Sequence, residues 1–106
     1  MAATMIVHWS ANAAIMLAEL SDYLTNVMGE YAADNYLDEL IAFGNAIAQK
    51  GEHFSFCRNL KLQALDCRCA TFRKKYVVVF KIVELQVNIL GVIHVSRGPD
   101  AFHSII

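Results

Sequence analysis

Two consecutive apolar runs between residues 76 and 97 constrain the fold more than any other stretch of the sequence. The runs are dense in β-branched and aromatic residues, and a short polar break at residues 84 to 86 separates them. This pattern predicts two adjacent antiparallel strands. In the second run both alternating faces are largely apolar, so we expect a central strand covered on both sides. The expected faces are Val87, Ile89, Gly91, Ile93 and Val95 on one side and Asn88, Leu90, Val92 and His94 on the other.

The sequence upstream of these strands predicts two amphipathic helices. Apolar residues recur at helical spacing over residues 11 to 28, with Ser10 in the N-cap position and Gly29 as a stop. The same spacing continues over residues 30 to 50. Two helices joined by so short a link form an antiparallel hairpin. Because neither helix can bury its apolar stripe alone, we expect the hairpin to lie on the sheet.

Three further segments complete the predicted order of elements. Residues 5 to 9 form a short β-type run, and residues 51 to 63 show no clear period and are expected to be a loop with at most one short extended piece. Residues 65 to 72 alternate as a strand and lead through a basic turn at residues 73 to 75 into the first apolar run. The sequence thus predicts one α+β domain over the whole chain, a two-helix hairpin packed on a small antiparallel-rich sheet in the order β-α-α-β-β-β.

Composition narrows the class of protein. The hydrophobic fraction of 57% is high for a small soluble domain, so we expect apolar surface to remain for a partner. No apolar run approaches the roughly 18 residues that span a bilayer, and no charged segment precedes an apolar one, so the sequence predicts a cytoplasmic protein. The three cysteines, Cys57, Cys67 and Cys69, lack the spacing of a metal site and are expected to be reduced thiols that pack as small hydrophobes.

The two halves of the chain carry opposite charge. Residues 1 to 50 contain one basic and six acidic residues, whereas residues 51 to 106 contain eight basic and four acidic residues. The formal net charge of the chain is only −1 because these halves nearly cancel. Such asymmetry indicates a macromolecular partner that is itself charged.

The candidate binding residues are cations on the predicted strands and turns. Gly-rich phosphate loops, nucleophile motifs and clustered carboxylates are absent from the sequence, so we expect neither a metal nor a cofactor. The cationic set that remains could bind phosphates or an acidic protein surface, or could be ordinary surface charge. Arg68 stands out because a guanidinium in mid-strand is costly unless its donors find a partner. The set comprises Arg68, Arg73, Lys74, Lys75, Lys81 and Arg97, with Arg58 and Lys61 in the preceding loop.

Catalysis by a histidine is a second possibility. His94 is flanked by apolar residues, which favours a hydrogen-bonded core histidine, whereas His103 lies on the tail six residues beyond Arg97. A metal-free ribonuclease needs a base for the 2′-hydroxyl, an acid for the leaving oxygen and cations for the phosphate. His103 would supply this set with Arg68, Arg73 and Arg97 if the four side chains converge.

In the order of its elements and in three short motifs, the chain resembles the RelE/ParE superfamily of bacterial toxins from type II toxin–antitoxin modules. The motifs are Trp9-Ser10-Ala11 at the start of the first helix, Arg68 before the strand at residues 76 to 80, and Val92-Ile93-His94-Val95-Ser96-Arg97, which is similar to the Val-x-His-x-x-Arg ending of the ParE branch. The resemblance covers residues 5 to 100, almost the whole chain.

The two branches of this superfamily differ in function. ParE toxins bind and block DNA gyrase, whereas RelE toxins are ribosome-dependent endonucleases that cut messenger RNA. The helical hairpin and the His94-x-x-Arg97 ending resemble ParE, which implies a gyrase inhibitor whose target contacts include Arg68, the basic turn at residues 73 to 75, His94 and Arg97. The RelE alternative implies an acid–base role for His103, although the lysine cluster of RelE is missing from the comparable strand. A non-toxic interaction domain on the same scaffold is a third possibility.

Either branch implies a cognate antitoxin and a toxin–antitoxin hetero-oligomer. We expect the antitoxin to fold along the acidic helical hairpin and to cover its apolar residues, leaving the basic edge of the sheet as the toxic surface. The residues expected to contact the antitoxin are Leu17, Leu24, Tyr31, Tyr36 and Phe43.

Overall fold

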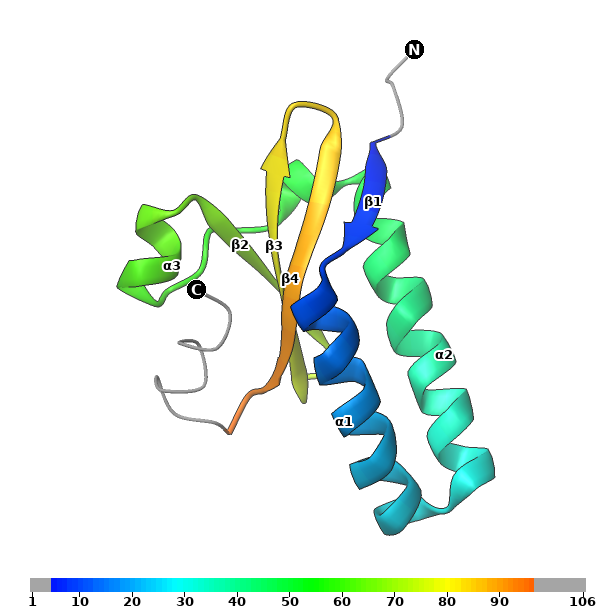
Figure 1. The fold of residues 1–106 in the computed structure, drawn as a ribbon. Helices are drawn as coiled ribbons and strands as arrows, with labels where there is room; N and C mark the ends of the chain where they lie inside the picture. The colour runs from blue at the N-terminus through cyan, green and yellow to red at the C-terminus, as the bar shows by residue number, and fades with distance from the viewer. Residues whose placement is uncertain (1–4, 97–106) are drawn as a thin grey trace.

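A computed structural model describes residues 5 to 96 of the chain (Figure 1). Its elements are β1 (Ile6–Trp9), α1 (Ala11–Met28), α2 (Glu30–Ala46), the 3₁₀ turns η1 (Ile47–Gln49) and η2 (Gly51–His53), α3 (Leu60–Ala64), β2 (Cys67–Phe72), β3 (Tyr76–Val83) and β4 (Gln86–His94). The predicted α+β class and the order β-α-α-β-β-β are confirmed, and α3 is an addition that the sequence interpretation missed. None of the helices within residues 5 to 96 is long and apolar enough to cross a membrane.

The four strands form one mixed sheet in the order β1-β4-β3-β2. β1 runs parallel to β4, whereas the β2–β3 and β3–β4 pairs are antiparallel. β4 is therefore central, as its apolar faces predicted. The first and last strands lie side by side although some 80 residues separate them, as the Ser10 Oγ contact to the Leu90 carbonyl shows.

Local sequence signals set the limits of the helical hairpin. The Ser10 hydroxyl accepts a hydrogen bond from the Ala13 N–H at 3.0 Å and caps α1. Gly29, at a φ of 85°, ends α1 and donates its N–H to the Thr25 carbonyl at 3.0 Å. α2 is shorter than predicted, because the chain tightens into η1 after Ala46.

The hairpin packs on one face of the sheet and runs past its end (Figure 1). The main core lies between them and consists of Ala13, Leu40, Ile47, Ala70, Phe72, Tyr76, Val78, Phe80, Val87, Ile89 and Val92. A separate cluster of Leu24, Ala33 and Leu37 joins α1 to α2 beyond the sheet. One part of the hairpin thus packs on the sheet, whereas the other part is held only by contacts between α1 and α2.

An irregularity in β4 overturns the predicted alternation of its faces. Val79 pairs with Gly91 and Phe80 pairs with Ile89, so Leu90 has no partner in β3. A bulge of this kind shifts the phase of all residues that follow. Val92 consequently joins Ile89 in the core under the helices, whereas Leu90 packs on the opposite face.

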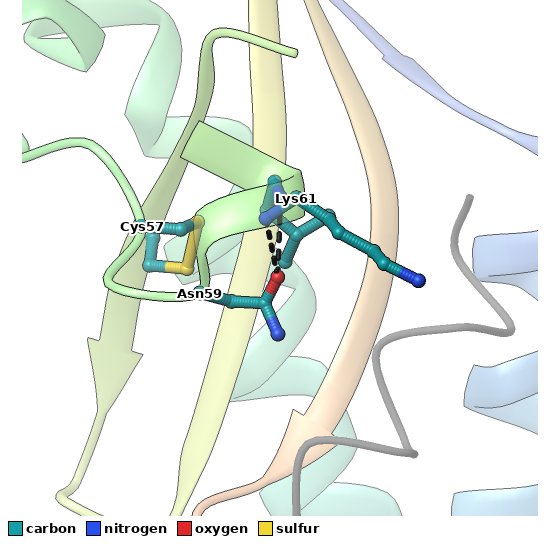
Figure 2. Close-up of a disulfide and its surroundings, with 5 residues drawn as sticks. Cys57, Asn59 and Lys61 are labelled. Carbon is teal, nitrogen blue, oxygen red and sulfur yellow. Dashed lines mark hydrogen bonds between the residues drawn. A yellow bond between two sulfur atoms is a disulfide. The ribbon is translucent and has the colours of Figure 1, made fainter. Parts of the chain in front are cut away.

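The opposite face of the sheet is covered in part by residues 57 to 62, which belong to the segment 51 to 63 that we expected to be a loop. Asn59 caps α3 by accepting hydrogen bonds from the N–H groups of Lys61 and Leu62. Cys57, just before this cap, forms a disulfide with Cys69 in β2 (Figure 2). The expectation of three reduced thiols is wrong for this pair, because the segment brings their Cα atoms to 5.0 Å. Cys67 is the free, buried thiol.

Candidate target-binding site at the turn end of the sheet

The β2–β3 turn and the last residues of β4 meet at one end of the sheet. Tyr76, which begins β3, lies opposite His94, and the Val95 N–H donates to the Lys75 carbonyl at 2.8 Å. The basic turn at residues 73 to 75 is therefore brought beside His94. We call this set of residues, 73 to 76 with 94 to 96, the turn end.

The basic turn has an uncommon backbone. Arg73 and Lys74 have φ values of 51° and 60°, and the Lys75 N–H donates to the Phe72 carbonyl at 3.0 Å. Positive φ at both central residues is the arrangement of a type I′ hairpin turn, which asparagine and glycine adopt more easily. Cations held in such a conformation are candidates for function, because strained backbone conformations cluster at functional sites.

Arg73 is oriented by α2. Its guanidinium forms an ion pair with Glu39, and both side chains are about half exposed, at 50% and 55%. The guanidinium also lies 5.1 Å from the ring centre of Phe72 and 5.3 Å from that of Tyr36. An exposed ion pair of this kind is weak, so Arg73 is aligned without being sealed from a partner. Lys74 and Lys75 are exposed and make no ion pair within residues 5 to 96.

His94 is a half-buried histidine with a defined tautomer. The Ser96 N–H donates to its Nδ1 at 3.0 Å, and the Ser96 hydroxyl lies 2.7 Å from the same nitrogen. Because a backbone N–H can only donate, Nδ1 is the acceptor, and the ring proton of neutral His94 lies on Nε2. The ring also meets Tyr76 edge to face at 5.1 Å. His94 is thus hydrogen-bonded, as its apolar neighbours predicted, and it still belongs to the turn end.

Two tyrosines behind the turn end were not predicted as part of this site. The Tyr36 and Tyr76 rings lie 6.0 Å apart, and the Tyr36 hydroxyl has no hydrogen-bond partner within residues 5 to 96. Burial raises the pKa of Tyr36, against the opposing charge of Arg73. Burial likewise raises the pKa of Tyr76, with smaller contributions from Tyr36 and Tyr23. The β3–β4 register would have found Tyr76, since it places that ring opposite His94.

Arg68 lies elsewhere. It pairs with Phe80 in the sheet and is five residues before Arg73, which corresponds to about 16 Å of strand at about 3.3 Å per residue. Its Nη1 donates to the carbonyls of Phe54 at 2.6 Å and Glu52 at 3.3 Å, and its guanidinium stacks 4.2 Å above the Phe56 ring. The partner that a mid-strand arginine needs is therefore supplied by the chain itself.

Comparison with known proteins assigns the fold. No protein-family model matches the sequence, and no curated protein matches it. Among solved structures, a chain of a chromosomal ParDE TA system from P. aeruginosa is similar, with a TM-score of 0.72 and 17% identity over 88% of this chain and 98% of that chain. The chain has the ParE-like toxin fold.

The remaining predicted site residues differ in whether the structure describes them and in how exposed they are. Arg97 and His103 lie outside the described residues, so the structure leaves their positions open. Of the residues predicted to contact an antitoxin, Tyr31 is 83% exposed, whereas Leu24 is 3% exposed between the two helices. Leu17, Tyr36 and Phe43 are half-buried and pack against the main core. No group of three or more His, Cys, Asp or Glu side chains within residues 5 to 96 is arranged to hold a metal.

Proposed function

We propose that this protein is the toxin of a type II toxin–antitoxin module and that it inhibits DNA gyrase until a cognate antitoxin neutralises it. The observation that supports this proposal is the similarity to a chain of a ParDE TA system over 98% of that chain's length. The place of action is then the cytoplasm, where gyrase works.

The turn end is the surface that we assign to the target. It combines exposed Lys74 and Lys75, the partly exposed guanidinium of Arg73 and the half-buried ring of His94. A planar guanidinium and two ammonium groups suit a partner rich in carboxylates or phosphates. Lys74 and Lys75 are exposed at this turn, so a partner can reach both ammonium groups.

The helical hairpin is the surface that we assign to the antitoxin. Residues 11 to 46 contain six acidic residues and no basic residue, and all six are exposed. Large apolar side chains are exposed beside them, including Ile15, Tyr23, Val27 and Tyr31. An antitoxin segment with basic and apolar side chains would complement this surface. Leu24 would then support the hairpin from within, and Tyr31 would make direct contact.

Induced expression followed by two assays on purified protein tests the proposal. We expect growth arrest and inhibition of gyrase supercoiling, without cleavage of transcripts on ribosomes. Ribosome-dependent cleavage would instead identify the RelE-like alternative, an endonuclease in which His103 acts as acid or base. Normal growth with a correctly folded protein would overturn both and leave an interaction domain.

Paired charge reversals separate the two assigned surfaces. Lys74→Glu with Lys75→Glu should abolish supercoiling inhibition, because it replaces both free cations of the turn end with anions. The matched control, Glu30→Lys with Asp34→Lys, makes the opposite charge change on the exposed hairpin and should leave inhibition intact while weakening neutralisation by the antitoxin. If the hairpin pair abolishes inhibition and the turn pair does not, the two surfaces are assigned the wrong way round.

A further inference from the structure

Three cysteines gather on the face of the sheet opposite the hairpin. Cys57 and Cys67 are buried with Leu62 and Val79, and Cys69 packs against this cluster. Cys57 and Cys69 form the disulfide, 12 residues apart in sequence, and Figure 2 shows it immediately before the Asn59 cap of α3. The bond therefore ties the segment before α3 to β2.

The tied segment forms an outer edge on β2. The Cys57 N–H donates to the Cys67 carbonyl at 2.9 Å, and the Cys69 N–H donates to the Ser55 carbonyl at 3.1 Å. Phe56 pairs with Arg68 between these two bonds. These hydrogen bonds and the disulfide hold residues 55 to 57 to β2, and the Phe54 ring before them packs on Phe80 at 5.9 Å.

The same segment contacts the guanidinium of Arg68 and accepts the hydrogen bonds of its Nη1. Arg68 lies between Cys67 and Cys69, and its guanidinium contacts the Glu52 and Phe54 carbonyls and the Phe56 ring. All three contacts belong to residues 52 to 57, which we call the clamp segment. Arg68 is partly exposed, and it keeps these contacts as long as the clamp segment stays in place.

We propose that Cys57 and Cys69 form a reversible thiol–disulfide switch that controls whether Arg68 is available to a partner. This proposal goes beyond the proposed function, because it concerns a second cation that is remote from the turn end. In one premise it rests on the proposed function, which places the protein in the cytoplasm. A disulfide there is usually of the redox-sensing kind, because the compartment keeps structural thiols reduced.

A dithiol reductant opens the switch, and the disulfide form of such a compound closes it by the reverse exchange, in which it is reduced to the dithiol. One reductant thiolate attacks the sulfur of Cys69, which is partly exposed, whereas Cys57 is only 1% exposed. The S–S bond breaks, the Cys57 sulfur leaves as a thiolate and takes a proton, and a mixed disulfide links Cys69 to the reductant. The second reductant thiol then displaces Cys69, so that two protein thiols and one reductant disulfide result.

Cys67 is placed beside this pair without taking part in the exchange. Burial raises the pKa of the Cys67 thiol, Lys81 opposes this shift, and Asp66 adds to it. A buried thiol that holds its proton is a poor nucleophile. The pair therefore responds to an external dithiol and does not reshuffle with Cys67.

Labelling of arginines in the full-length protein tests the proposal. The oxidised protein, its disulfide verified by mass spectrometry, and the protein reduced with dithiothreitol are each treated with phenylglyoxal, and modification is mapped by residue. We expect reduction to increase the labelling of Arg68 several-fold and to leave that of Arg73 unchanged. This readout does not depend on toxicity. The switch can therefore fail while the proposed function holds, and the proposed function can fail while the switch holds.

Two variants serve as matched controls. Cys69→Ser should show high Arg68 labelling with or without dithiothreitol, whereas Cys67→Ala should keep the redox response of the native protein. Equal Arg68 labelling in the oxidised and reduced proteins would overturn the switch. Increased labelling of Arg68 and Arg73 together would also overturn it, because the disulfide would then hold the whole fold. A protein that forms no Cys57–Cys69 bond under oxidising conditions would refute it as well.

Discussion

At the residue scale, Arg73 and Lys74 have backbone conformations that lower the stability of the protein. We assign both residues to binding of the target. Left-handed conformations cost residues with a Cβ atom about 1–2 kcal/mol each. A hairpin turn under selection for stability alone would carry asparagine and glycine at these two positions. Two long cations at positive φ indicate that presenting charge outweighs the stability lost.

Replacing Lys74 tests whether its left-handed conformation lowers the stability of the protein. Lys74→Gly relieves the left-handed conformation at a φ of 60° and should raise the free energy of unfolding by about 1 kcal/mol. Lys75→Gly is the matched control, because it removes the same charge at a residue without positive φ and should give no gain. Urea denaturation measures both. Equal stability effects of the two variants would show that the turn is not strained.

Tyr36 gives a prediction for alkaline pH. Its pKa is raised mainly by burial, so the folded protein holds this proton more tightly than the unfolded chain does. The resulting stability is fully present below about pH 10, the unfolded value, and is lost as pH rises through the folded value. Urea unfolding between pH 8 and 11 should therefore show a shallower decline for Tyr36→Phe than for the native protein.

The same variant has an expected effect at neutral pH. The Tyr36 hydroxyl is buried and has no hydrogen-bond partner within residues 5 to 96, so its removal should leave stability unchanged or raise it by up to about 1 kcal/mol. Tyr31→Phe, on an exposed ring of α2, is the control and should change neither property. A loss of more than about 1 kcal/mol in Tyr36→Phe would mean that the hydroxyl has a partner after all.

At the scale of elements, the sequence predicted what local signals determine. Ser10 and Gly29 set the limits of the hairpin, and the apolar runs gave β3 and β4. The faces of β4 beyond Ile89 were wrong, because a bulge depends on how two strands pair and leaves no mark in the alternation of one strand. α3 was missed although Asn59 is a cap signal, because five residues are too few to show helical periodicity.

The candidate site was predictable only in part, because some of its contacts depend on how distant segments pair. The basic turn and His94 meet because the hairpin register brings the two ends together, which the run lengths already indicated. The contacts that engage Arg68 depend on the clamp segment, whose pairing with β2 is a tertiary contact. The disulfide was missed for the same reason, since spacing alone does not fix a pairing.

Gly44 joins two elements and gives a prediction at this scale. A Cβ atom at this position of α2 would lie 2.5 Å from the Trp9 ring of β1, whose Nε1 donates to Asn45 at 2.9 Å. Gly44→Ala should therefore destabilise the protein by about 1–3 kcal/mol through overpacking, despite the better helix propensity of alanine. Ala42→Gly, at an exposed position of the same helix, should cost about 1 kcal/mol by propensity alone. Urea unfolding measures both, and a stabilised Gly44→Ala would show that Trp9 can move aside.

At the scale of the whole molecule, the two parts of the hairpin differ in support. The sheet-bound part shares the main core, whereas Leu24, Ala33 and Leu37 form a small cluster of their own. Regions with few buried contacts open locally at lower free energy than a core does. The end that we assign to the antitoxin is thus the less stable end, which suits a surface that gains order on binding.

Native-state hydrogen exchange measures this difference. Backbone amides near Leu24 and Leu37 should exchange at least about tenfold faster than those of Val78 and Ile89, which lie in the core of the sheet. Addition of the antitoxin should slow the hairpin amides and leave the sheet amides unchanged. Uniform protection across both regions would instead show a single cooperative unit.

The pairing of β1 with β4 has a consequence for the nascent chain. The sheet cannot close until residues 86 to 94 have been synthesised and have left the ribosome, whereas α1 and α2 can associate as soon as residue 46 emerges. The hairpin of the nascent chain is therefore exposed to solvent before the sheet has formed. If the antitoxin binds the hairpin, it can bind the nascent chain before the sheet, and with it the proposed toxic surface, has formed.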